Sequence, residues 1–117
     1  MKKTNLVKTF YANIYCGLRE GYNGKIHTVQ EAIRICSDYC NKVKLGVTVT
    51  PTNFVYVDGD EPGVIIGLIN YPRFPSNEWS TRANAYELTK ILLKKFKQER
   101  MTIVFPDITE MIEREDK

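Results

Sequence analysis

The chain has 117 residues, of which 43% are hydrophobic and 26% charged, and a formal net charge of +3 at pH 7. This is the size and composition of one ordinary globular domain, so we expect a single domain over residues 1–117. The sequence has no apolar run near the ~20 residues of a membrane-spanning helix, and its charge is too low for a protein that follows a nucleic-acid backbone. We therefore expect a cytoplasmic protein that binds neither membranes nor DNA.

The first half of the chain predicts a strand, a helix and a second strand. Residues 6–18 alternate between apolar and polar positions, which is typical of a half-buried strand. Thr28 and Glu31 form a capping box that begins a helix, and Gly46 is expected to end it. Residues 47–57 are again extended, with a break expected at Pro51.

The second half repeats this alternation of strands and a helix. Residues 58–63 have the composition of a turn, and 64–70 form the most apolar strand. A helix then runs to residue 98, a strand covers 100–105, and a short acidic helix or tail is expected over 107–117. The order β-α-β-β-α-β predicts an α+β, ferredoxin-like fold, in which a four-stranded antiparallel sheet carries two helices on one face.

The cysteines and the single histidine, His27, do not predict a metal centre. Three cysteines are an odd number and do not form a disulfide framework. Cys36 and Cys40 lie four residues apart on an apolar helix face, where a small apolar side chain is the ordinary choice. A tetrahedral metal site needs four ligands, or three and a water. We expect neither a metal nor a cofactor.

The segment Tyr71-Pro72-Arg73-Phe74-Pro75 lies between the apolar strand and the second helix. Its two prolines restrict their own backbone angles and those of the residues before them. A restrained aromatic ring can stack on a planar ligand, and a guanidinium beside it can hold a phosphate. On its own, the segment fits equally well as a rigid connector whose Phe74 packs into the core.

Other polar residues lie near the ends of the predicted elements. Arg100 and Thr102 share one face of the last strand, and Asn84 lies near the start of the second helix. Arg19 follows the first strand, before a loop that contains glycines. Together with Phe74, these side chains predict a nucleotide-binding pocket.

Catalytic signatures are missing from the sequence. It has no nucleophile elbow, phosphate-binding loop, dinucleotide fingerprint or carboxylate pair. We therefore expect a binding protein that is not an enzyme. Two alternatives stay open: an enzyme that degrades a nucleotide, and an RNA-binding module of the same topology. The RNA-binding use requires aromatic residues on the first and third strands, and residues 64–70 contain none.

Four segments resemble a family of phage proteins, the first described family of Thoeris anti-defence proteins: 17–22 (GLREGY), 47–52 (VTVTPT), 63–75 (GVIIGLINYPRFP) and 100–104 (RMTIV). The resemblance implies dimers that assemble into a hexamer in the cytoplasm of the host bacterium. It implies sequestration of a cyclic ADP-ribose signal, the 1''-2' or 1''-3' glycocyclic isomer made by a TIR enzyme, without cleavage, so that Thoeris immunity is blocked. It also implies that cyclic oligonucleotides of the CBASS type are bound at separate sites.

The same resemblance implies six ligand-binding residues: Phe74, Asn84, Arg100, Thr102, Arg73 and Arg19. Phe74 would stack on the adenine, and Asn84 would hydrogen-bond the ligand. Arg100 and Thr102 would hold phosphates or riboses. The remaining two arginines are assigned either to this pocket, to the second ligand site or to a contact between subunits.

Overall fold

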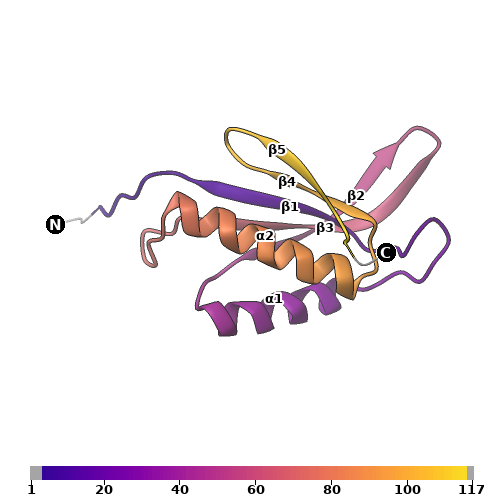
Figure 1. Cartoon of the computed structure of the whole chain (residues 1–117), viewed down its shortest axis with the longest axis horizontal. Helices are drawn as coiled ribbons and strands as arrows, with labels where there is room; N and C mark the ends of the chain where they lie inside the picture. The colour runs from indigo at the N-terminus through magenta and orange to yellow at the C-terminus, as the bar shows by residue number, and fades with distance from the viewer. Residues whose placement is uncertain (1–3, 116–117) are drawn as a thin grey trace.

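Two helices lie on one face of a five-stranded antiparallel sheet in the computed structural model, which describes residues 4–115 (Figure 1). The elements follow the chain as β1 (Tyr11–Gly17), α1 (Val29–Val43), β2 (Thr48–Tyr56), β3 (Gly59–Ile69), α2 (Glu78–Lys95), β4 (Arg100–Val104) and β5 (Thr109–Glu113). The strands are arranged in the order β2-β3-β1-β4-β5. Neither of the described helices is long and apolar enough to cross a membrane.

The predicted four-stranded, ferredoxin-like sheet is wrong, because β5 adds a fifth strand. The first six elements occur in the expected order, but β5 then pairs with β4 from Arg100↔Glu113 to Val104↔Thr109. It replaces the predicted C-terminal helix. The reason is local: a tight turn closed by the Phe105 N–H on the Ile108 carbonyl is followed by residues that alternate between exposed and half-buried positions, which is the period of a strand. Residues 116 and 117 of the predicted tail lie outside the described residues.

Two further boundaries differ from the prediction around the β2–β3 hairpin. The break at Pro51 does not occur, because β2 is an edge strand, where a residue without an N–H is tolerated. Residues 59–63 belong to β3 and not to a turn, since the turn is confined to the segment around Asp58, whose φ is 62°. As a result, Glu61 lies within the sheet.

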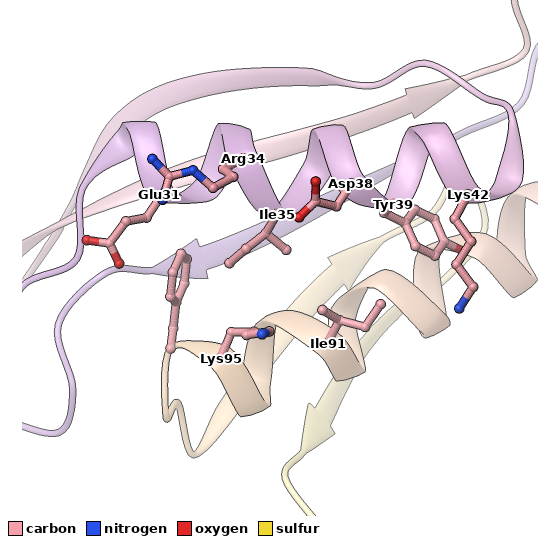
Figure 2. A pocket seen from close by; sticks show the side chains of 9 residues that line it. Glu31, Arg34, Ile35, Asp38, Tyr39, Lys42, Ile91 and Lys95 are labelled. Atoms are coloured by element: carbon pink, nitrogen blue, oxygen red, sulfur yellow. The ribbon is translucent and has the colours of Figure 1, made fainter.

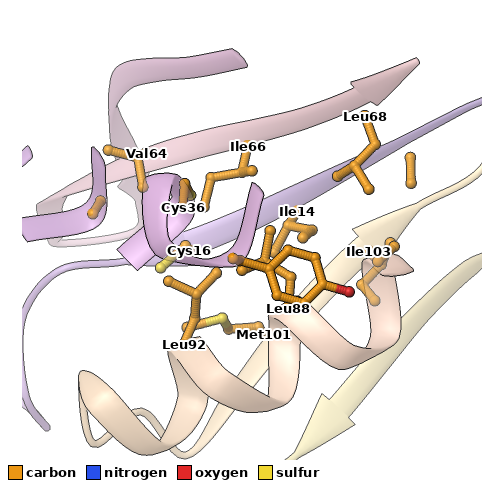
Figure 3. Packing of buried hydrophobic residues seen from close by; sticks show 14 of the residues in the cluster. Ile14, Cys16, Cys36, Val64, Ile66, Leu68, Leu88, Leu92, Met101 and Ile103 are labelled. Atoms are coloured by element: carbon orange, nitrogen blue, oxygen red, sulfur yellow. The ribbon is translucent and has the colours of Figure 1, made fainter. Parts of the chain in front are cut away.

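The core fills the space between the sheet and the helices (Figure 3). The predicted inner face of the first strand is confirmed, since all of its apolar members are at most 8% exposed: Phe10, Ala12, Ile14, Cys16 and Leu18. They pack against the apolar stripe of α2, which includes Leu88 and Leu92. Because side chains alternate along a strand, Tyr11, Asn13 and Tyr15 lie on the opposite face, which neither described helix covers.

His27 ties the loop after β1 to α1. Its Nε2 lies 2.5 Å from Glu20 Oε2 and its Nδ1 lies 2.6 Å from Glu31 Oε2, and its ring stacks on Phe96 with the centroids 4.6 Å apart. The hydrogen bond to His27 also holds the pKa of Glu31 below its usual value. The histidine is thus part of the structural framework beside the helix cap.

Candidate functional site

A pocket of about 460 Å³ opens on the face of the sheet that is opposite the helices, and we refer to it as the open-face pocket. Its polar and aromatic lining comes from strands β1 to β4 and, for Gln98, from the connection between α2 and β4: Tyr15, Phe54, Glu61, Gln98, Arg100 and Thr102. Strand register brings these side chains together. Tyr15 is directly opposite Thr102 on β4, and Phe54 is directly opposite Glu61 on β3, so each pair shares a face.

Two glycines make room for this pocket. A Cβ at position 63 would overlap the ring of Phe54, and a Cβ at position 17 would lie 2.9 Å from Gln98 Oε1 and 3.2 Å from Glu61 Oε2. Both distances are shorter than ordinary van der Waals contact. Gly17 and Gly63 therefore allow the side chains of the neighbouring strands to lie flat across the sheet.

The pocket is attached to the loop after β1 through Gln98. This side chain is 9% exposed, and its Nε2 donates a hydrogen bond of 2.6 Å to the carbonyl oxygen of Arg19. Arg19 is thus beside the pocket, with its backbone held by a lining residue. On the other side, the Arg100 guanidinium lies 3.7 Å from Glu113 of β5, and both side chains are more than half exposed.

Three members of the open-face pocket lining, Tyr15, Phe54 and Glu61, suit a cationic group, while a fourth, Arg100, is itself a cation. The rings of Tyr15 and Phe54 are 6.2 Å apart at an angle of 45°, and they present electron-rich faces beside the Glu61 carboxylate. Aromatic faces and a carboxylate attract ammonium or sulfonium groups. Thr102 and Gln98 add neutral hydrogen-bonding groups. A small organic cation that carries hydroxyl groups matches this lining.

Three of the predicted site residues line a different pocket, of about 500 Å³, which we call the loop pocket. Arg73, Phe74 and Asn84 lie there, near the start of α2, whereas Arg100 and Thr102 line the open-face pocket, beyond the end of α2. Within one chain, the six predicted residues therefore do not form one site. The alternative in which Phe74 packs into the core is wrong, because this side chain is 67% exposed.

A third hollow, of about 360 Å³, lies between the two helices (Figure 2). Ile35 and Ile91 face each other across it, and acidic and basic side chains alternate along its rim. The Tyr39 hydroxyl donates to Glu87 at 2.7 Å, and burial together with this hydrogen bond raises the pKa of Tyr39. The mixed charges are typical of a solvated groove between packed helices.

The buried titratable groups do not offer a nucleophile. Burial raises the pKa of the Cys16 thiol and raises that of Cys36 to about 12, so both are uncharged at neutral pH. Burial and a hydrogen bond to Glu110 raise the pKa of Tyr86 to about 12. Among residues 4–115, histidine, cysteine and carboxylate side chains do not gather in groups of three that could hold a metal ion.

The fold is similar to that of a phage SAM lyase, an enzyme. The chain matches a phage SAM lyase in complex with S-methyl-5'-thioadenosine with a TM-score of 0.83 and 17% sequence identity, over 100% of this chain and 98% of that one. It matches a phage SAM lyase in the apo state with a TM-score of 0.78 and 19% identity, over 92% of this chain and 91% of that one. No family model and no curated protein matches the chain by sequence.

This comparison corrects the function predicted from the sequence. The solved structures that share the fold along the chain are those of an enzyme, so the expectation of a non-catalytic Thoeris sponge that sequesters cyclic ADP-ribose is wrong. Identities of 17% and 19% establish the shared fold and no more. The expected dimers and hexamer, and the binding of cyclic oligonucleotides, stay predictions.

Sequence reasoning missed Phe54, Glu61 and Gln98. The sequence predicts a turn at Glu61 and the end of a helix at Gln98, and neither pattern indicates a site residue. The alternation of the first strand did place Tyr15 on the outer face. A signal for the pocket was the pair of glycines in adjacent strands, at positions 17 and 63, because glycine within a strand often marks a close approach to another group.

Proposed function

We propose that this chain is an S-adenosylmethionine (SAM) lyase that holds its substrate in the open-face pocket and releases S-methyl-5'-thioadenosine. The observation that carries the proposal is the aromatic and acidic lining formed by Tyr15, Phe54 and Glu61, on a fold shared with a phage SAM lyase. The coarser part of the sequence prediction, a phage anti-defence protein, agrees with this proposal. An enzyme that removes SAM deprives the host of its methyl donor.

The proposed reaction breaks the bond between the sulfonium sulfur and the Cγ of the four-carbon arm. The electron pair of this bond stays on sulfur, so the cation becomes a neutral thioether. The carboxylate of the arm attacks Cγ and closes a five-membered lactone, which keeps its ammonium group. Atoms and charge balance without water, because the nucleophile belongs to the substrate. The protein then has to fold the arm back on itself and hold it near attack distance.

Glu61 is suited to hold the ammonium group of that arm. The sulfonium loses its charge as the bond breaks, so a strong interaction with sulfur would stabilise the substrate more than the transition state. The ammonium charge is unchanged through the reaction, and a carboxylate that binds it can orient the arm without this penalty. Tyr15 and Phe54 offer weaker attraction to the sulfonium and flat surfaces for the adenosyl group.

Thr102 and Arg100 were expected to hold phosphates or riboses, and part of that role fits the proposed reaction. Thioadenosine carries a ribose and no phosphate, and the Thr102 hydroxyl, opposite Tyr15, is suited to the ribose. The Arg100 side chain is more than half exposed, so solvent screens its attraction for the substrate carboxylate. That carboxylate must stay free to act as the nucleophile.

Product analysis tests this proposal. The purified protein is incubated with SAM, and the products are measured by liquid chromatography with mass spectrometry. We expect S-methyl-5'-thioadenosine and a four-carbon lactone in equal amounts. Glu61→Gln should reduce the rate strongly, whereas Asp60→Asn, an exposed position on the same strand, should not. Intact SAM after prolonged incubation with folded protein would refute the proposal.

A further inference from the structure

The loop between β3 and α2 holds an exposed aromatic ring on a fixed backbone. The carboxamide of Asn70 closes the base of this loop: its Nδ2 donates to the Lys8 carbonyl at 2.9 Å, and its Oδ1 accepts from the Ser76 N–H at 2.7 Å. Inside the loop, the Phe74 N–H donates to the Tyr71 carbonyl at 3.0 Å. A ring that is 67% exposed and already restrained loses little entropy when a ligand stacks on it.

The loop pocket beside this ring is positively charged. Among the described residues that line it, two are cations, Lys44 and Arg73, and none is acidic. The lining of the open-face pocket, in contrast, has one acid, Glu61, and one cation, Arg100. The Arg73 guanidinium lies 5.6 Å from the centroid of the Phe74 ring, so a charge and a stacking surface are side by side. This combination favours an anion that also carries a planar ring.

Neutral hydrogen-bonding groups from α2 complete the lining. Ser80 and Asn84 lie on the first two turns of the helix and line the pocket. The Asn84 Oδ1 lies 3.2 Å from the Tyr39 hydroxyl oxygen, whose proton is donated to Glu87 at 2.7 Å. An amide nitrogen and a hydroxyl can read the polar edge of a heterocycle or a sugar.

We propose that the loop pocket binds an aromatic anion of mononucleotide size, with its ring stacked on Phe74 and its phosphate held by Arg73 and Lys44. A volume of about 500 Å³ is within the range of small-molecule sites. The site is separate from the open-face pocket, since the two pockets share no lining residue. The proposal therefore does not depend on SAM cleavage.

Calorimetric titration with adenosine 5'-monophosphate (AMP) tests the site. We expect saturable binding of AMP, and binding of adenosine or of inorganic phosphate that is about tenfold weaker or more, because each lacks one of the two contacts. Phe74→Ala should weaken AMP binding by about 5- to 150-fold, the loss measured when a base loses its aromatic stacking partner. Arg73→Gln should weaken AMP binding and also reduce its dependence on salt.

Two control variants decide between sites. Trp79→Ala removes another exposed aromatic side chain, 78% exposed on α2 and outside the lining, and should leave AMP affinity unchanged. Glu61→Gln alters only the open-face pocket and should also leave it unchanged. The proposal is overturned if AMP does not bind at millimolar concentration, or if Phe74→Ala and Arg73→Gln bind it as wild type does. AMP affinity that changes with Glu61→Gln alone would place the nucleotide in the open-face pocket and equally overturn the proposal.

Discussion

Gly63→Ala tests whether the open-face pocket is built as described. The added Cβ would overlap the Phe54 ring and lie 2.8 Å from the carbonyl oxygen of Cys16, so the ring must leave its position across β3. Overpacking of this kind costs about 1–3 kcal/mol in free energy of unfolding. For a chain of this length, each kcal/mol lowers the melting temperature by roughly 3–6 °C. We expect a clear loss of stability together with loss of SAM turnover.

The assay is thermal unfolding followed by circular dichroism, with a matched glycine as control. A Cβ at Gly46 would meet only Tyr71, at 4.0 Å, so Gly46→Ala should be neutral, or stabilising by about 0.4–1 kcal/mol. Combining Gly63→Ala with Phe54→Ala removes the ring that the new methyl group strikes. The cost of Gly63→Ala should then be smaller in that background, and the difference measures the contact. A Gly63→Ala variant as stable as Gly46→Ala, or an equal cost in both backgrounds, would refute this description of the pocket.

Three further predictions follow from single side chains. Glu61→Gln should lower kcat/KM for SAM by roughly 20- to 250-fold. The reason is that a charge pair about 5 Å apart, at an effective dielectric constant of about 20–40, is worth about 1.7–3.3 kcal/mol. Steady-state kinetics measure this change, and an unchanged kcat/KM would remove Glu61 from the site. Thr89→Val should raise the free energy of unfolding by about 1 kcal/mol, because the Thr89 hydroxyl is buried without a hydrogen-bond partner in the described structure. Urea titration measures this free energy, and a destabilised variant would contradict the prediction. The hydrogen bond from Arg82 holds the pKa of Asp107 below its usual 3.8, so the stability that this pair provides is present above that pH and lost as pH falls through the lowered pKa. Asp107→Asn should reduce the pH dependence of the melting temperature below about pH 4, and an identical pH profile would refute the assignment.

The fold was predictable up to the point where local patterns stop deciding it. The apolar–polar alternation of β1 and the capping box of α1 are local sequence patterns, and both occur in the structure. The segment Thr109–Glu113 has only five residues, and its pairing with β4 depends on a turn that was not predicted from the acidic sequence of the tail. The sequence therefore predicted a short helix or tail where tertiary pairing forms a strand.

The candidate site was harder to predict because its side chains are brought together by the pairing register of neighbouring strands. Tyr15, Phe54 and Thr102 come from three strands, and they meet because Tyr15 is opposite Thr102 while Phe54 extends across Gly63. Residue types alone predicted that Thr102 and Phe74 share one pocket. In the structure, Thr102 lines the open-face pocket and Phe74 lines the loop pocket. Sequence could show that these side chains suit a nucleoside, but not which of them share a cavity.

The central claim is that the open-face pocket holds the thioadenosine part of SAM. Titration of the ¹⁵N-labelled protein with S-methyl-5'-thioadenosine, followed by amide chemical shifts, tests it most directly. We predict saturable shifts at Tyr15, Phe54, Glu61 and Thr102, lost in Phe54→Ala, while Phe74 keeps its position in the spectrum. Shifts centred on Phe74 and the loop pocket, or no saturable shifts at all, would contradict the claim.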